Sequence, residues 1–337
     1  MEQDILQLHP GLITGFGITV VVMLLLDLGI FNKKSHIVSS KEATIWSIVW
    51  ISLAMIFSGV VYYVFNQDAG GHKLAIEKFT QFQTAYWIEK ALSVDNLFVF
   101  ILVFSFFKVP RELYHRALFW GIIGALIFRA IFIFTGVELI NHTYLPEMTL
   151  LGKTVKINAV LTLFGLFLVY AGIQSWGADD SDADKDFSNN AGAKLIQRFF
   201  KVSDSFDGDK FFTTQNGVRL ATPLLTVIAV IEFTDLLFAV DSIPAIFAVS
   251  NDPFILYTSN IFAILGLRSL YFLLSNFIHM FSKLPYGLSV ILTFIGVKMI
   301  VAPWFHVPSP VSLGIVGGVL IVSVAASILF PDEKKDA

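Results

Sequence analysis

Cysteine is absent from this 337-residue chain, and charged side chains make up only 15% of it. The lack of cysteine excludes disulfides and thiolate metal sites. The net charge is −3 and no cluster of lysine and arginine forms a phosphate-binding patch, so no nucleic-acid partner is expected. Apolar residues are abundant instead, at 55% with a mean hydropathy of +0.73, well above that of a soluble domain. The composition therefore predicts an integral membrane protein surrounded by a lipid bilayer.

Nine segments are apolar over about the 20 residues that a helix needs to cross the hydrocarbon core. We therefore predict an all-α, polytopic membrane protein with about nine transmembrane helices. The segments are 12–31, 42–65, 83–107, 117–140, 157–176, 221–249, 258–280, 286–304 and 310–330.

Lysine and arginine are concentrated in alternate loops, and six of them lie in the long loop 177–220. Because such loops stay in the cytoplasm, the N-terminus is expected outside and the C-terminus inside. The loop opens with DDSDADKD (179–186), which lacks the glycine and glutamate of a calcium-binding EF-hand and is interpreted as a solvated acidic loop. The stretch FFTTQNGVRL (211–220) predicts a hairpin that turns at Asn216-Gly217.

An acidic motif occurs twice in the chain. EKALSVDN (89–96) and DLLFAVDS (235–242) each begin with an acid, and each has a second acid six residues later, between valine and a small polar residue. ALIFRAIFIF (125–134) likewise resembles ILGLRSLYFL (264–273), and YAGIQ before the long loop resembles FIGVK after it. Three landmarks therefore recur in the same order in two sets of three helices.

The third span runs inward and the sixth runs outward, so the two motifs enter the bilayer in opposite directions. We predict an inverted repeat of three plus three helices, the usual plan of secondary transporters, with a site near mid-membrane. A duplicated scaffold without transport is the alternative. The predicted parts are two N-terminal transmembrane helices (1–82), the first three-helix repeat (83–176), the cytoplasmic loop (177–220), the second, inverted repeat (221–304), and the last helix with a cytoplasmic tail (305–337).

Ionised side chains inside a membrane span are costly and usually functional. The two motifs supply hard oxygen ligands, which suit Mg²⁺, Mn²⁺ or Ca²⁺, whereas cysteine and mid-span histidine are lacking. The candidate metal-binding residues are Glu89, Asp95, Asn96, Glu232, Asp235, Asp241 and Ser242.

Glu89 and Asn96 share one face of a continuous helix because they are two turns apart, but Asp95 points elsewhere. The second motif behaves likewise. Bringing all these side chains to one point would require a break in each helix. Pro244 is expected to mark the break in the second motif, since proline removes a backbone hydrogen bond, and symmetry implies a break in the first.

Six acids and four bases lie within the predicted spans, which leaves the charge that one divalent ion would balance. Plain structural ion pairing is the alternative. Arg129 and Arg268 are expected to pair with acids, or to replace the cation in the empty carrier. Lys90 is expected to extend toward the interface, and Asp27 to be a gate or a helix-end residue. The predicted charge-pairing or gating set is Asp27, Lys90, Arg129, Arg268 and Lys298. Because a desolvated carboxylate binds protons as well as metal, proton antiport is a hypothesis.

The chain resembles the TerC family of integral membrane proteins, named for tellurium resistance, and within it the Alx-type members. The resemblance runs over nearly the whole chain and is carried by IEKALSVDNLFVF (88–100), by the stretch 232–274 and by YGLSVILTFIGVKM (286–299). Alx-type members are linked to Mn²⁺ export and to alkaline conditions. The resemblance therefore implies a stress-response protein of the bacterial inner (plasma) membrane that exports Mn²⁺ through the candidate metal-binding residues. An acidic pocket does not suit a tellurite anion, so that phenotype is interpreted as indirect.

Two other classes of function stay open. A Ca²⁺ or Mg²⁺ transporter would use the same site, because cavity size sets that choice. A membrane scaffold or assembly factor for metal handling would instead dock membrane or cytoplasmic proteins through loop 177–220. An enzyme is not expected, since there is no HExxH motif and no nucleophile–histidine pair. No cofactor is expected besides the transported ion, and the oligomeric state is left open.

Overall fold

The computed structural model of the protein describes residues 9–31, 39–150, 153–176, 190–215, 217–276, 283–305 and 307–330. Most of these residues are helical, which confirms the all-α fold class. The helices are α2 (Pro10–Phe31), α3 (Ser40–Phe65), α4 (Gly71–Phe106), the 3₁₀ turn η1 (Arg111–Leu113), α5 (Tyr114–His142), α6 (Ala159–Trp176), α7 (Ala191–Phe199), α8 (Pro223–Phe247), α9 (Pro253–Leu265), α10 (Leu267–Asn276), α11 (Leu284–Val301) and α12 (Ser309–Leu329). The strands are β1 (Met148–Leu150), β2 (Lys153–Val155), β3 (Phe212–Gln215) and β4 (Val218–Ala221).

Five helices in the described ranges are long and apolar enough to cross a bilayer: α3, α5 together with η1, α8, α11 and α12. The bent pair α9–α10 makes a sixth. The apolar parts of α2 and α6 are shorter, and α4 carries several charged residues in its sequence. The total of nine spans therefore stays a prediction.

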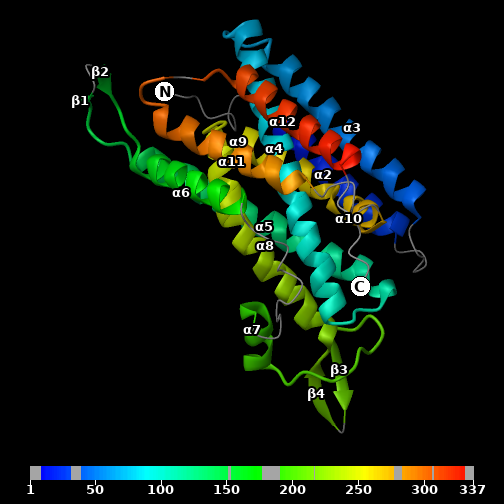
Figure 1. The fold of residues 1–337 in the computed structure, drawn as a ribbon. Coiled ribbons are helices and arrows are strands. Elements are labelled where there is room, and N and C mark those ends of the chain that lie inside the picture. Colours follow the sequence, from blue (N-terminus) through cyan, green and yellow to red (C-terminus); the bar gives the residue numbers. More distant parts are fainter. Residues whose placement is uncertain are drawn as a thin grey trace.

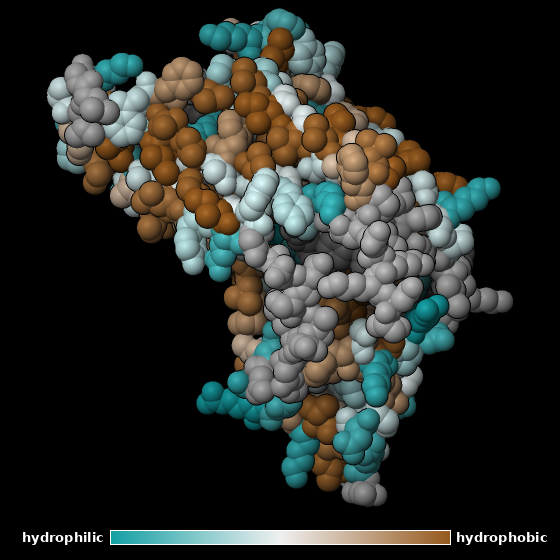
Figure 2. Space-filling model, viewed as in Figure 1, coloured by the Kyte–Doolittle hydropathy of each residue, from teal (hydrophilic) through white to brown (hydrophobic). Residues whose placement is uncertain are grey.

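Large apolar side chains cover the outside of the bundle. Ile321, Leu163 and Ile173 are 71%, 64% and 65% exposed, respectively. Figure 2 shows such residues gathered over α6, α11 and α12, with hydrophilic residues at the two ends of the molecule. This apolar belt between polar ends is the surface expected of a protein that faces lipid.

The helices that the sequence pairs as repeats also pack against one another. α4 contacts α8, α5 contacts α9, and α6 contacts α11. Figure 1 shows α4 descending from the top of the bundle while α8 rises from the bottom, so these two helices are antiparallel. This arrangement supports the inverted repeat, while the exact division of the chain into five parts stays a prediction.

Glycine brings α6 and α11 into close contact. A Cβ atom on Gly296 would lie 2.6 Å from the Gly165 carbonyl oxygen, and one on Gly172 would lie 2.4 Å from the Thr293 hydroxyl. Gly172 and Gly296 are the glycines of the repeated YAGIQ and FIGVK segments. The recurrence therefore has a packing reason, since small residues let helix backbones approach within a membrane.

α9 and α10 form one bent element, with an angle of 41° between them. Gly266 separates the two helices, and its N–H bonds to the carbonyl of Ile264. A Cβ atom at this position would lie 2.8 Å from Lys90 Nζ and 3.1 Å from Trp50 Cβ. The bend therefore lies where side chains of α3 and α4 approach the backbone of this element.

The segment between α6 and α8 forms a small polar region at the lower end of the bundle, built from α7 and the β3–β4 hairpin (Figure 1). The hairpin confirms the predicted turn, and Gly217 has the positive φ of 77° that such a turn requires. Arg116 of α5 forms an ion pair with Asp209 and lies 4.8 Å from the Phe211 ring centre. These contacts fasten the hairpin to the start of α5. The acidic run 179–186 lies outside the described residues.

Candidate functional site

A charged cluster lies inside the bundle, where α4, α5 and α8 meet. Glu89 of α4 and Arg129 of α5 are both completely buried, and Asp235 of α8 is only 2% exposed. α8 packs against both α4 and α5, and the three side chains lie inside the bundle and not on its surface. Ionised groups so deep in an apolar bundle are stable only when they neutralise one another.

Arg129 holds the cluster together. Its guanidinium forms ion pairs with Glu89 and with Asp235, the latter at 3.4 Å. The same group donates to Ser242 Oγ at 3.4 Å and to Asn260 Oδ1 at 3.3 Å. The predicted pairing of Arg129 with acids is therefore confirmed, and one side chain links α4, α5, α8 and α9.

Asn260 completes this network from α9. Its amide nitrogen donates to Glu89 Oε2 at 3.0 Å, while its amide oxygen accepts from Arg129. Ser93, one turn after Glu89, donates to Glu89 Oε1 at 3.3 Å. Neither residue is among the site residues predicted from the sequence. The signal for Asn260 was an amide side chain within the largely apolar sequence of α9. The signal for Ser93 was its position four residues after Glu89, which places both side chains on the same face of one helix.

Two carboxyl oxygens near the cluster are buried without a hydrogen-bond partner in the described part of the chain, namely Asp235 Oδ2 and Glu232 Oε2. Glu232 lies against α5 at Gly124, where a Cβ atom would fall 1.8 Å from that Glu232 oxygen. Only glycine leaves space for this carboxyl group. Such oxygens retain the capacity to bind a cation or a proton.

The donor set consists of carboxylate, amide and hydroxyl oxygens, which are hard ligands. Among the described residues, no three His, Asp or Glu side chains converge on one point. The side chains of Asp95, Asp241 and Asp27 lie outside the described residues, so their predicted roles stay predictions. Asn96 is buried, at 3% exposed, as its place beside Glu89 on the helix predicts.

The predicted helix breaks are wrong. α4 is continuous from Gly71 to Phe106, and α8 continues through Pro244 to Phe247. Pro244 lies in the last turn of α8, where proline costs one backbone hydrogen bond and the flanking buried residues Ala245 and Ile246 keep the chain helical. Glu89 and Asp235 both reach Arg129 without a break in either helix.

The expectation that Lys90 extends to the interface is also wrong. Lys90 is only 8% exposed, and its Nζ donates to the carbonyl oxygen of Ala263 at 3.2 Å. Ala263 lies in the last turn of α9, whose carbonyls lack helical partners and attract a cation. The bend at Gly266 therefore provides an internal partner for Lys90.

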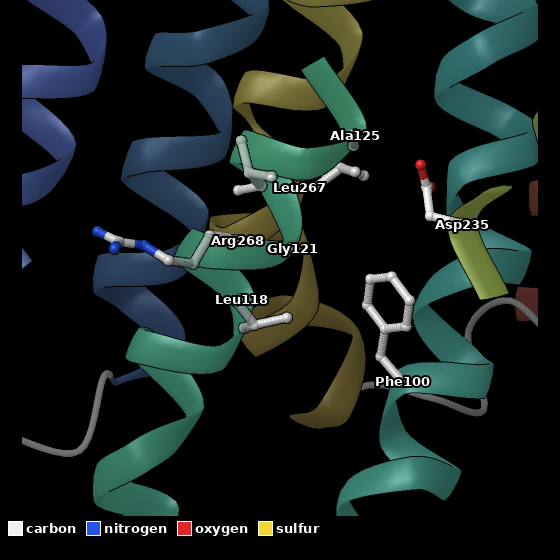
Figure 3. A pocket seen from close by; sticks show the side chains of 8 residues that line it. Phe100, Leu118, Gly121, Ala125, Asp235, Leu267 and Arg268 are labelled. Carbon is white, nitrogen blue, oxygen red and sulfur yellow. The ribbon is translucent and has the colours of Figure 1, made fainter. Parts of the chain in front are cut away.

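Arg268, the repeat counterpart of Arg129, is buried at 4% exposed. It lines a small cavity of about 10 Å³ together with Asp235 and Phe100. In Figure 3 its guanidinium points away from Asp235. Its predicted pairing with an acid stays a prediction.

Lys298 lies elsewhere, at a cavity of about 330 Å³ between the start of α4 and the ends of α8 and α11. Within the described ranges it belongs to no ion pair with the cluster. Lys78, at the same cavity, pairs with Asp252 at 2.6 Å. The structure therefore places Lys298 apart from the cluster around Arg129.

Comparison with known proteins identifies relatives over nearly the full length. The chain is 43% identical to "Uncharacterized membrane protein STKORF319" of Myxococcus xanthus over 322 residues, which cover 95% of this chain and 92% of the relative. It is 40% identical over 315 residues to "Putative membrane-bound redox modulator Alx" of Escherichia coli (strain K12), covering 93% of each chain. No solved structure matches the chain. Residues 74–335 match the integral membrane protein TerC family, and the chain therefore belongs to that family of membrane proteins.

Proposed function

We propose that the chain exports a hard divalent cation, Mn²⁺, in exchange for protons. The proposed setting is the bacterial inner membrane, with the N-terminus outside and the C-terminus in the cytoplasm. The observation that carries the proposal is that Glu89 and Asp235, from two repeat-related helices, lie buried around one guanidinium. Two carboxylates in a membrane interior need a cationic partner. Arg129 is that partner in this structure, and a metal ion takes its place when Arg129 withdraws.

The oxygens that Arg129 contacts are also the proposed ligands of the ion. Glu89, Asp235, Ser242 and Asn260 present only oxygen to the guanidinium, the donor type that Mn²⁺, Mg²⁺ and Ca²⁺ share. Metal and Arg129 therefore compete for one position. This competition would let the empty carrier return without leaving two unpaired buried charges.

Manganese and protons enter the proposal for different reasons. Mn²⁺ follows from the link of Alx-type proteins to manganese export, and the donor set alone does not separate it from Ca²⁺ or Mg²⁺. Protons follow from the buried, unpartnered oxygens of Glu232 and Asp235, since a desolvated carboxylate exchanges a metal ion for a proton. The remaining motif residues, Asp95, Asn96 and Asp241, are proposed as further ligands.

The name of the Alx relatives describes a redox modulator. This chain contains no cysteine, so thiol–disulfide exchange by its own side chains is excluded. A redox effect would then arise indirectly, through the metal that the protein moves.

The direct test is flux of Mn²⁺, Ca²⁺ and Mg²⁺ into sealed vesicles that contain the purified protein, with and without a pH gradient. Wild type should move Mn²⁺ and respond to the gradient, whereas Glu89→Gln and Asp235→Asn should fall to the background of empty vesicles. Glu138→Gln is the matched control, because Glu138 is an exposed acid on α5 with a side chain 71% accessible. Unchanged Mn²⁺ flux in both site variants would contradict the proposal. Complete absence of flux in wild type would favour the scaffold function.

A further inference from the structure

α7 is a short amphipathic helix in the polar region between α6 and α8. Its apolar face contains Leu195, Ile196 and Phe199, and the adjoining face contains Lys194 and Arg198. Gly192 and Ala193 are buried, but Leu195 and Phe199 are 55% and 69% exposed. Only part of the apolar face of α7 is therefore covered by the protein itself.

The covered part of α7 rests on the side of α8. A Cβ atom on Gly192 would lie 2.2 Å from the Ala229 carbonyl oxygen, so the two helices touch at this glycine. Ala229 is about 9 Å along α8 from its first residue, Pro223, at 1.5 Å per residue. α8 is long and apolar enough to cross a bilayer. α7 therefore lies beside the first two turns of a membrane-spanning helix, at the depth of the bilayer surface.

The uncovered part of α7 has the composition of a membrane-surface helix. Leu195 and Phe199 are exposed apolar side chains, while Lys194, Arg198 and the following Lys201 are exposed cations. Helices with this pattern lie in the interface with the apolar face among acyl chains and the basic face at anionic headgroups. The charge pattern favours phospholipid over a partner protein with an acidic surface, because the apolar and basic strips lie side by side.

α7 is also joined to the helices that carry the charged cluster. Phe200, which follows α7, makes an edge contact with Phe212 of β3 at 5.2 Å between ring centres. Arg219 of β4 covers the other side of that contact, 4.3 Å from the Phe212 ring centre. The hairpin in turn pairs with α5 through Arg116 and Asp209. These contacts, together with that of Gly192 on Ala229, connect α7 to both α5 and α8.

We propose that α7 binds the surface of the bilayer, with Leu195 and Phe199 among the acyl chains and Lys194 and Arg198 at anionic phospholipid headgroups. The polar region of α7 and the β3–β4 hairpin is thereby held flat against the membrane. This inference does not depend on which ion crosses the protein.

The absence of cysteine permits a sharp test, because single-cysteine variants carry one spin label each. Phe199→Cys and Gln197→Cys place the label on the apolar and on the polar side of α7 in the full-length protein. We measure collision of the label with oxygen, which is lipid-soluble, and with a water-soluble nickel chelate. The vesicles are phosphatidylcholine with or without phosphatidylglycerol.

The label at position 199 should collide severalfold more with oxygen than with nickel, and the label at 197 should show the reverse. Phosphatidylglycerol should increase this contrast, and Lys194→Gln with Arg198→Gln should abolish that increase. Equal nickel accessibility at both positions would overturn the proposal. A label at 199 that is protected only in native membranes, and not in vesicles, would also overturn it and identify a protein as the occupant.

Discussion

Replacing Arg129 with glutamine should destabilise the folded protein by about 3–5 kcal/mol, the cost of removing one partner from a buried ion pair. The upper part of this range is expected, because Arg129 forms ion pairs with both Glu89 and Asp235. Without the guanidinium, Glu89 keeps the hydrogen bonds from Ser93 and Asn260 among the described residues. These neutral donors do not offset a full buried charge.

The free energy of unfolding is measured by reversible denaturation in mixed detergent micelles. The matched control is Arg116→Gln, since Arg116 and Asp209 are 38% and 66% accessible and a surface pair contributes about 0–1 kcal/mol. The variant that combines Arg129→Gln with Glu89→Gln and Asp235→Asn contains no buried charge at the cluster. It should therefore recover at least half of the lost stability. A combined variant less stable than Arg129→Gln alone would refute the electrostatic reasoning.

Three further changes test the packing and the polar region. Gly296→Ala should lower the unfolding temperature by forcing α6 and α11 apart, whereas Gly314→Ala should leave it unchanged, because nothing lies within 4 Å of a Cβ atom there. Gly266→Ala should slow Mn²⁺ flux in the vesicle assay by displacing the buried lysine at the bend; a rate equal to wild type would contradict this role for the glycine. Hydrogen bonds from Thr213 and from a neighbouring lysine hold the pKa of Asp207 below its usual value of 3.8. These bonds therefore stabilise the hairpin above that pH, and the contribution is lost as pH falls through the lowered pKa. Thr213→Val should raise the pKa of Asp207, measured by carboxyl ¹³C titration, and an unchanged titration would show that the hydroxyl has no effect.

The sequence was sufficient to predict that Glu89 and Asp235 lie on helices that pack together, while their role in binding an ion stays a prediction. A helix has 3.6 residues per turn, so Glu89 and Asn96 share one face of α4, and Asp235 and Ser242 share one face of α8. All four side chains are buried. The pairing of Arg129 with acids followed from the cost of an isolated charge in a membrane interior. Asn260 was missed because periodicity within one helix does not reveal which neighbouring helix it faces.

The location of the helix break could not be predicted from proline alone. Pro244 falls so near the end of α8 that its missing hydrogen bond changes little. The bend lies instead at Gly266, where a Cβ atom would lie 2.8 Å from Lys90 Nζ and 3.1 Å from Trp50 Cβ, so a side chain there would displace both neighbours. A sequence shows the glycine but not the two neighbours that make it necessary.

The length of α4 has a consequence for orientation experiments. Its 36 residues extend over about 54 Å, at 1.5 Å per residue. Even a tilt of about 40° leaves roughly 41 Å along the bilayer normal, more than the hydrocarbon core of about 30 Å. The first turns of α4 therefore extend beyond the hydrocarbon core into water, and a hydrogen bond of 2.7 Å between His72 and Tyr62 of α3 holds them in place. An impermeant amine reagent added to sealed vesicles would reach Lys73 in these turns from one side of the membrane only. Its reaction therefore reports the direction in which each molecule was inserted.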